Sequence, residues 1–192
     1  MTQQTSHILK IMELALKQDP RPLERLVKGK PNAAGKKAVE ALTKRDMKDA
    51  KDPKSLPLVQ GALYLCFDCW KEAHELADAH EGTAAGHWLH AIVHRREPDA
   101  GNSKYWYAKV KAPAPLFQAI GKEALNLLKQ QPVAGLVPLA EKLESSGTWE
   151  PAAFVDLCDQ FKEEDPDSPA YRTLARIQEI EWRGLAEYIL TS

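Results

Sequence analysis

Apolar residues recur along the chain at intervals of three and four, the spacing that places side chains on one face of an α-helix. The pattern begins with Ile8, Ile11, Met12 and Ala15. The prolines within 19–22 predict the end of this first helix, because proline disfavours helix in the residue before it. A short helix over 23–28 and a Lys- and Ala-rich surface helix over 32–51 are expected next.

The most regular apolar stripe predicts one continuous helix over about 57–77. Its members lie at offsets 0, 3, 4, 7, 10, 11, 14 and 18: Val59, Ala62, Leu63, Cys66, Cys69, Trp70, Ala73 and Ala77. Such a stripe faces a core. Because Cys66 and Cys69 belong to it, we interpret this CxxC pair as buried small apolar side chains rather than as a zinc or redox pair, and Cys158 in the same way.

Six more helices are expected in the rest of the chain. Thr83 is a suitable N-cap for a helix that runs to Arg96. Four helical patterns follow, over 102–110, 117–128, 136–144 and 151–162. Ser168 and Pro169 predict the start of the last helix. Since no segment alternates as a half-buried strand does, we predict an all-α protein, a single globular domain over 1–192 with eight to ten helices packed as helical hairpins or an irregular bundle.

The composition and the charge fit a soluble protein. Lys and Arg total 26 and Asp and Glu total 27, for a formal net charge of −1, so no overall positive field favours nucleic acid. The uncharged stretch 55–67 is too short to span a bilayer, and the N-terminus lacks the basic and apolar regions of a signal peptide. Three cysteines argue against a disulfide framework. We therefore predict a cytoplasmic protein that binds neither membranes nor nucleic acid.

Histidines are concentrated in one short part of the chain. Five of the six lie between residues 74 and 94: His74, His80, His87, His90 and His94. At about 100° per residue, the last three share one face of their helix, opposite Trp88, Leu89 and Ile92. His90 and His94 are four residues apart, a spacing by which helices present paired imidazoles to a metal.

A third imidazole is expected from the preceding helix. His74 lies at the margin of the apolar stripe there, so a tight turn between the two helices would bring it towards His87 or His90. The carboxylate of Glu75 or of Asp78 would orient an imidazole through its second nitrogen. The set His74, His90 and His94 is therefore a candidate site for a divalent metal ion. The alternative is that the imidazoles bond to neighbours and to one another on a partly solvated face.

The residues that follow suggest a second interpretation, a pocket for a small ligand. Arg95 or Arg96 would hold a carboxylate or phosphate, and Tyr105, Trp106 and Tyr107 would form walls, because ligand sites are mostly apolar with a few convergent polar groups. The candidate binding residues are His74, His90, His94, Arg95, Arg96, Glu97, Asn102, Tyr105 and Trp106. Taken singly, each has a structural alternative, with Trp106 as a core residue and the arginines in surface ion pairs with Glu97 or Asp99.

The segment 87–110 resembles an uncharacterised protein family in which HRRE, a following Asp and N-x-KYW form one block. The resemblance implies a site without implying an activity. The resemblance covers much of the chain, from the segment that contains His74 onward. The matching positions here are His74, His90, His94, Arg95, Arg96, Glu97, Asp99, Asn102, Lys104, Tyr105 and Trp106. A weaker resemblance is to Sel1- and tetratricopeptide-type helical hairpins, which bind other proteins, although no second copy recurs at a fixed period.

Two functions therefore stay open. The first is a histidine-rich pocket between helices that binds a small ligand, which includes anions, or a metal ion, with or without catalysis. The second is a helical protein–protein interaction module without catalysis. Histidines that converge on one point favour the first, and histidines that diverge favour the second. A purely structural role, the third interpretation, predicts that each imidazole bonds to its own neighbours.

Overall fold

The computed structural model describes residues 25–43 and 52–192. All regular secondary structure in these residues is helical. They form nine α-helices and two short 3₁₀ segments, with no strand among them. The prediction of an all-α protein is confirmed for this part of the chain. The helix expected over 8–15 lies outside the described residues.

Most helices begin and end near the residues that the sequence indicates. Their bounds are α2 Ala33–Glu40, α3 Leu56–Cys66, α4 Trp70–Asp78, α5 Ala84–Arg96, α6 Ala100–Tyr107, α7 Ala114–Gln130, α8 Val137–Ser146, α9 Pro151–Phe161 and α10 Pro169–Thr191. The 3₁₀ segments are Pro53–Ser55 and Ala134–Leu136. Thr83 and Ser168 each accept a hydrogen bond from the first turn of their helix, which confirms both expected N-caps.

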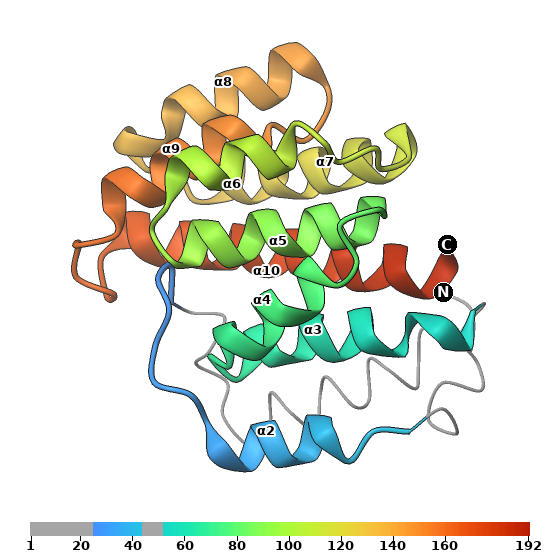
Figure 1. Cartoon of the computed structure of the whole chain (residues 1–192). Helices are drawn as coiled ribbons and strands as arrows, with labels where there is room; N and C mark the ends of the chain where they lie inside the picture. Colours follow the sequence, from blue (N-terminus) through green and yellow to red (C-terminus); the bar gives the residue numbers. More distant parts are fainter. Residues whose placement is uncertain (1–24, 44–51) are drawn as a thin grey trace.

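Helices α5 and α10 lie in the middle of the arrangement, with α6 to α9 on one side and α2 to α4 on the other (Figure 1). The long helix α10 packs on α3, α5, α7 and α9, and its Trp182 donates a hydrogen bond from Nε1 to the carbonyl of Ala62 (2.7 Å). Every residue of α5 except Ala84 and His87 is buried. The face with the three histidines, expected to be partly solvated if they are only structural, is mostly enclosed, since His90 and His94 are buried and only His87 is partly exposed.

The helix expected over 57–77 is wrong in one respect, since two helices occupy this range. α3 ends at Cys66 and α4 begins at Trp70, with Asp68 between them at a φ of 54°. A left-handed conformation costs a residue with a side chain roughly 1–2 kcal/mol. The Asp68 carboxylate is fixed there by the side chain of Arg96 and by the backbone N–H of Gly29 (3.0 Å). These partners lie 28 and 39 residues away, so the local apolar stripe gives no sign of the break.

Two predictions near the N-terminal end of the described chain also need correction. Residues 25–28 are not helical, so the helix expected over 23–28 is wrong for them. Leu26 donates its N–H to the hydroxyl of Tyr171 (2.9 Å) and Lys28 donates to the carbonyl of Arg96 (2.7 Å), which ties this segment to α10 and α5 instead. The helix expected over 32–51 ends at Glu40, and 44–51 lie outside the described residues.

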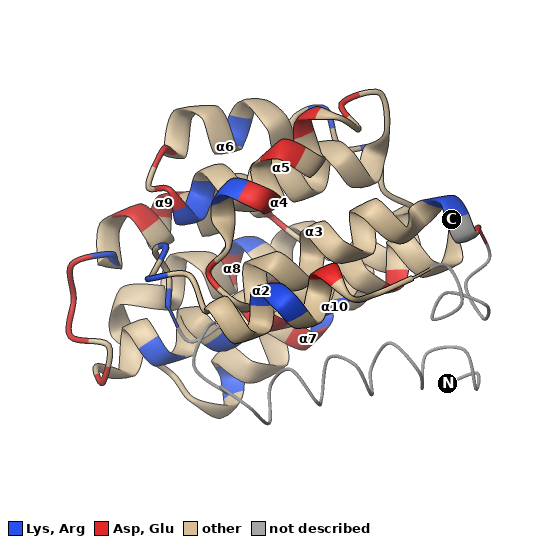
Figure 2. Cartoon of the chain, turned by 60° about the horizontal axis from the view of Figure 1, so that its bottom comes forward, with Lys and Arg blue, Asp and Glu red and all other residues tan. Residues whose placement is uncertain are grey.

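Charged residues of both signs occur along the described helices. In the view of Figure 2, basic and acidic residues are interspersed along the helices. Within 25–43 and 52–192, no helix has both the length and the apolar character that crossing a membrane requires.

The three cysteines are buried free thiols, as the apolar stripe predicts. Burial raises the pKa of Cys69 to about 11 and that of Cys158 to about 12. A thiolate is the form that binds metal or exchanges disulfides, so burial disfavours such chemistry at these side chains near neutral pH.

Candidate metal site

The turn between α4 and α5 sets the distance between the histidines of the two helices. Thr83 accepts a hydrogen bond from the N–H of Gly86 and donates its hydroxyl to the carbonyl of His80 (both 2.9 Å). A Cβ on Gly86 would lie 2.1 Å from that carbonyl oxygen, so only glycine fits here. The turn therefore packs closely on the first turn of α5, and His74 of α4 comes to lie beside His90 of α5.

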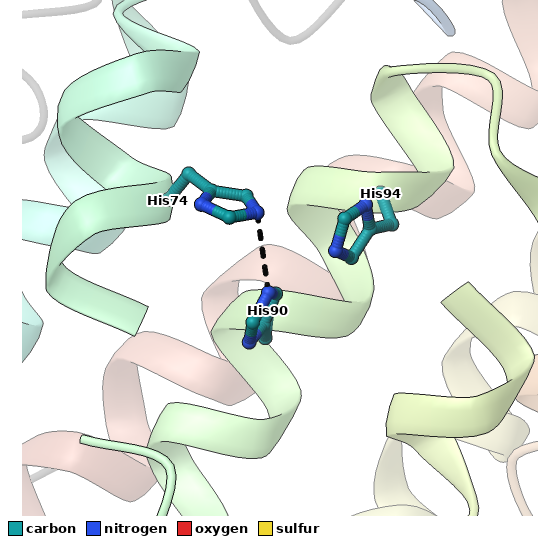
Figure 3. Close-up of side chains that lie close together, drawn as sticks. All are labelled: His74, His90 and His94. Carbon is teal, nitrogen blue, oxygen red and sulfur yellow. Dashed lines mark hydrogen bonds between the residues drawn. The ribbon is translucent and has the colours of Figure 1, made fainter. Parts of the chain in front are cut away.

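His74, His90 and His94 converge between α4 and α5 (Figure 3). One ring nitrogen from each lies within 4.8 Å of the other two. Nε2 of His74 is 3.3 Å from Nε2 of His90, and the His74 ring stands edge-on to both others, at centroid distances of 4.7 and 5.1 Å. The expected approach of His74 to His90 is thus confirmed, and the described residues contain a cluster that could hold a metal ion.

Two carboxylates contact the rings from outside the cluster. Nδ1 of His74 lies 3.0 Å from Oδ2 of Asp78, and Nδ1 of His94 lies 3.2 Å from Oε2 of Glu97. A neutral imidazole that donates its Nδ1 proton to a carboxylate keeps the lone pair of Nε2 for a second partner. At His74 this second nitrogen faces the cluster. At His94 it lies 3.0 Å from the amide nitrogen of Asn102.

His90 is the most enclosed of the three histidines. Its ring stacks on Trp106 at 4.0 Å and on His94 at 4.8 Å. Its side chain is 4% exposed, against 27% for His74 and 49% for Asp78, and its Nδ1 has no hydrogen-bond partner among the described residues. The site is therefore closed on the α5 side and reaches solvent through α4.

The buried imidazoles are held in their neutral form. Burial, followed by the neighbouring His94 and His74, lowers the pKa of His90 to about 4 against the opposing effect of Asp78. Burial and His74 also lower the pKa of His94, while Glu97 acts in the opposite direction. Both rings are thus neutral at pH 7. A metal ion binds the neutral imidazole, so these rings need lose no proton on coordination.

The two arginines of the predicted site are held in buried ion pairs. Arg95 pairs with Glu181 of α10, and Arg96 pairs with Asp68 in the turn between α3 and α4. Their side chains are 1% and 2% exposed. Glu181 also accepts hydrogen bonds from the hydroxyl of Tyr107 (2.6 Å) and from other donors, so this pair connects α5, α6 and α10.

This arrangement corrects two expectations for the arginines. Surface ion pairs of Arg95 or Arg96 with Glu97 or Asp99 are wrong, because both guanidinium groups are in the interior with other partners. The expected contact of Arg95 or Arg96 with a bound anion does not fit the structure, because a buried carboxylate already lies beside each guanidinium group. The partners lie 86 and 28 residues away in the chain.

The remaining predicted site residues divide into two groups. Glu97, Asn102 and Trp106 contact the histidine cluster, as described above. Tyr105 is 55% exposed and stands edge-on to Trp106, with the ammonium group of Lys109 4.1 Å from its ring centre. His87 lies apart from the cluster, with Nδ1 3.2 Å from the carbonyl of Lys109.

One residue of the site has no counterpart in the sequence analysis. The carboxylate of Glu81 belongs with Asp78 and His90 to a second group of metal-capable atoms, all within 4.8 Å of one another. Glu81 lies in the turn after α4, where helical periodicity does not predict the direction of a side chain. Its place directly before Gly82-Thr83, a turn and cap signal, is the local indication that it lies near the start of α5.

Comparison of the chain with known protein families, with curated proteins and with solved structures found no match. The family resemblance and the likeness to Sel1- and tetratricopeptide-type hairpins stay predictions. The geometry of the site is therefore the basis for a function.

Proposed function

We propose that the protein binds one divalent transition-metal ion, with Zn²⁺ as the first candidate, through His74, His90 and His94. The observation that carries the proposal is the 3.3 Å separation of Nε2 of His74 from Nε2 of His90. Metal–nitrogen bonds of about 2.0–2.1 Å place two ligands of a tetrahedral ion about 3.3–3.4 Å apart. The two atoms thus have the spacing of two ligands of one ion, and His94 supplies a third nitrogen within 4.8 Å.

The charges around the cluster favour a cation over an anion. Asp78 and Glu97 contact its imidazoles, and Lys28 pairs with the other oxygen of Glu97 at 3.4 Å. Arg95 and Arg96 are neutralised in their own ion pairs. Imidazole is a ligand that suits zinc, copper, iron and nickel. Carboxylates on the second nitrogen are the usual outer partners of metal-bound histidine.

Binding through Nε2 of His94 requires a change at Asn102, whose amide nitrogen now lies 3.0 Å from that atom. A half-turn of the amide brings its carbonyl oxygen to the same place, so that an acceptor rather than a donor faces the ion. Three protein ligands leave one position for water or a small ligand, as in catalytic zinc sites. The half-exposed Asp78 marks the side from which that position is reached. We therefore infer an open site.

Elemental analysis of protein purified without an affinity tag tests this proposal. The variant His74→Gln removes the most exposed ligand, and His87→Gln is the matched control, because it changes a histidine of the same region outside the cluster. We expect about one zinc per chain in the wild type and in the control, and an affinity loss of more than about 100-fold in His74→Gln. Wild-type protein that takes up no metal from a zinc buffer, or His74→Gln that binds it as tightly, would contradict the proposal.

A further inference from the structure

A second group of metal-capable atoms lies at the solvent side of the same site. The carboxylates of Asp78 and Glu81 and a ring nitrogen of His90 are within 4.8 Å of one another. Asp78 and Glu81 are exposed, whereas His90 is buried. His90 therefore belongs to two groups, an outer one with two carboxylates and an inner one with two further histidines.

Nε2 of His90 is the atom that the two groups share. It lies 3.3 Å from Nε2 of His74 and 3.4 Å from Oδ1 of Asp78. The one lone pair of this nitrogen binds one ion, so the two groups are alternative positions for a single cation rather than a two-metal centre. A cation that moves between them keeps its bond to His90 and exchanges carboxylate oxygen for imidazole nitrogen.

The outer position is suited to the capture of a hydrated cation. α4 ends at Asp78, so the negative end of the helix dipole points to this place. The N–H of Glu81 bonds to the carbonyl of Asp78 (3.3 Å), which fixes Glu81 one turn beyond the helix end. Exposed carboxylates raise the local concentration of cations and their rate of association. The inner position, with His90 and His94 buried, offers no such approach from the α5 side.

We propose that Asp78 and Glu81 form an entry site, where a divalent cation binds together with His90 before it passes to His74, His90 and His94. The inference rests on the proposed metal site. Glu81 then affects the rates at which the cation binds and dissociates, and it is not one of the final ligands. Asp78 contacts both positions, so Glu81 is the residue that isolates the entry step.

Stopped-flow mixing of Zn²⁺ with metal-free protein measures this step through tryptophan fluorescence, because Trp106 stacks on His90. Dissociation is measured separately with excess chelator. For Glu81→Gln we expect association and dissociation rate constants that both fall about tenfold, with a Kd within about twofold of wild type. Glu75→Gln is the matched control: it removes the same charge from an exposed residue of α4, paired with Lys71 at 4.0 Å, and leaves both rates unchanged.

Each other outcome overturns the entry site. Equal slowing in Glu81→Gln and Glu75→Gln would show a general effect of charge. Faster dissociation with unchanged association in Glu81→Gln would make Glu81 a permanent ligand. Unchanged rates would remove it from the path. If the wild type binds no Zn²⁺ at all, the metal site itself fails, and equilibrium titration of the wild type separates that result from the others.

Discussion

Acid is expected to destabilise the metal-free protein through His90. The pKa of His90 in the folded protein is about 4, because the ring is buried beside His94 and His74. In an unfolded chain a histidine titrates near 6.5. Between these values the unfolded chain binds more protons than the folded one, so the contribution of His90 to stability is intact above about pH 6.5 and is lost progressively as the pH falls towards 4.

The size of this effect follows from the pKa difference. One pKa unit corresponds to about 1.4 kcal/mol, so a difference of roughly 2.5 units sets an upper bound near 3.4 kcal/mol. At pH 4.5 the transition is incomplete, and we expect a loss of about 2–3 kcal/mol in the free energy of unfolding relative to pH 7. The side chain is 4% exposed, so solvent does not screen the ring strongly.

Urea unfolding followed by circular dichroism, in the presence of a chelator and at several pH values from 7 to 4.5, measures this loss. His90→Gln is expected to lack the His90 contribution, so its stability falls by about 2–3 kcal/mol less than that of wild type over the same range. The control His80→Gln changes a histidine of the turn, with Nδ1 2.7 Å from the carbonyl of Leu76, and should follow the wild type. Equal losses in wild type and His90→Gln would show that His90 does not cause the loss of stability in acid.

Three further predictions concern the structure around the site. Glu181→Gln leaves Arg95 without its buried carboxylate and should lower the free energy of unfolding by about 3–5 kcal/mol. The control Glu179→Gln, which changes an exposed ion pair on the same helix, should change this free energy by less than about 1 kcal/mol. Similar urea midpoints for the two variants would contradict the role of the buried pair. Gly86→Ala puts a methyl group 2.1 Å from a backbone oxygen and should lower the melting temperature, while Gly82→Ala, with no atom within 4 Å of the added carbon, should not; equal shifts would contradict it. The three buried cysteines should react with a thiol reagent only after denaturant is added, and rapid reaction in buffer alone would contradict their burial.

Much of the fold could be predicted because it depends on local signals. Helical spacing of apolar residues located most helices, and side-chain caps at Thr83 and Ser168 located two starts. The break at Asp68 could not be predicted in this way. The apolar stripe continues across it, and the left-handed conformation depends on Arg96 and Gly29, which are distant in sequence.

The same distinction explains the candidate site. His90 and His94 are four residues apart on one helix, so their proximity follows from helix geometry. The approach of His74 could be inferred from a short turn, whereas the 3.3 Å distance depends on close packing at Gly86. The pairing of Arg95 with Glu181 spans 86 residues, and no local pattern indicates it. Because the sequence does not show this pairing, Arg95 is expected from the sequence alone to be available for contact with an anion.

The most direct test of the metal site is X-ray absorption spectroscopy at the zinc edge of a 1:1 complex with Zn²⁺. We expect a first shell of nitrogen and oxygen at about 2.0–2.1 Å, with the outer-shell scattering of three imidazole rings in the wild type and of two rings in His74→Gln at saturating zinc. Sulfur scattering at about 2.3 Å, or the same number of imidazoles in wild type and in His74→Gln, would contradict it.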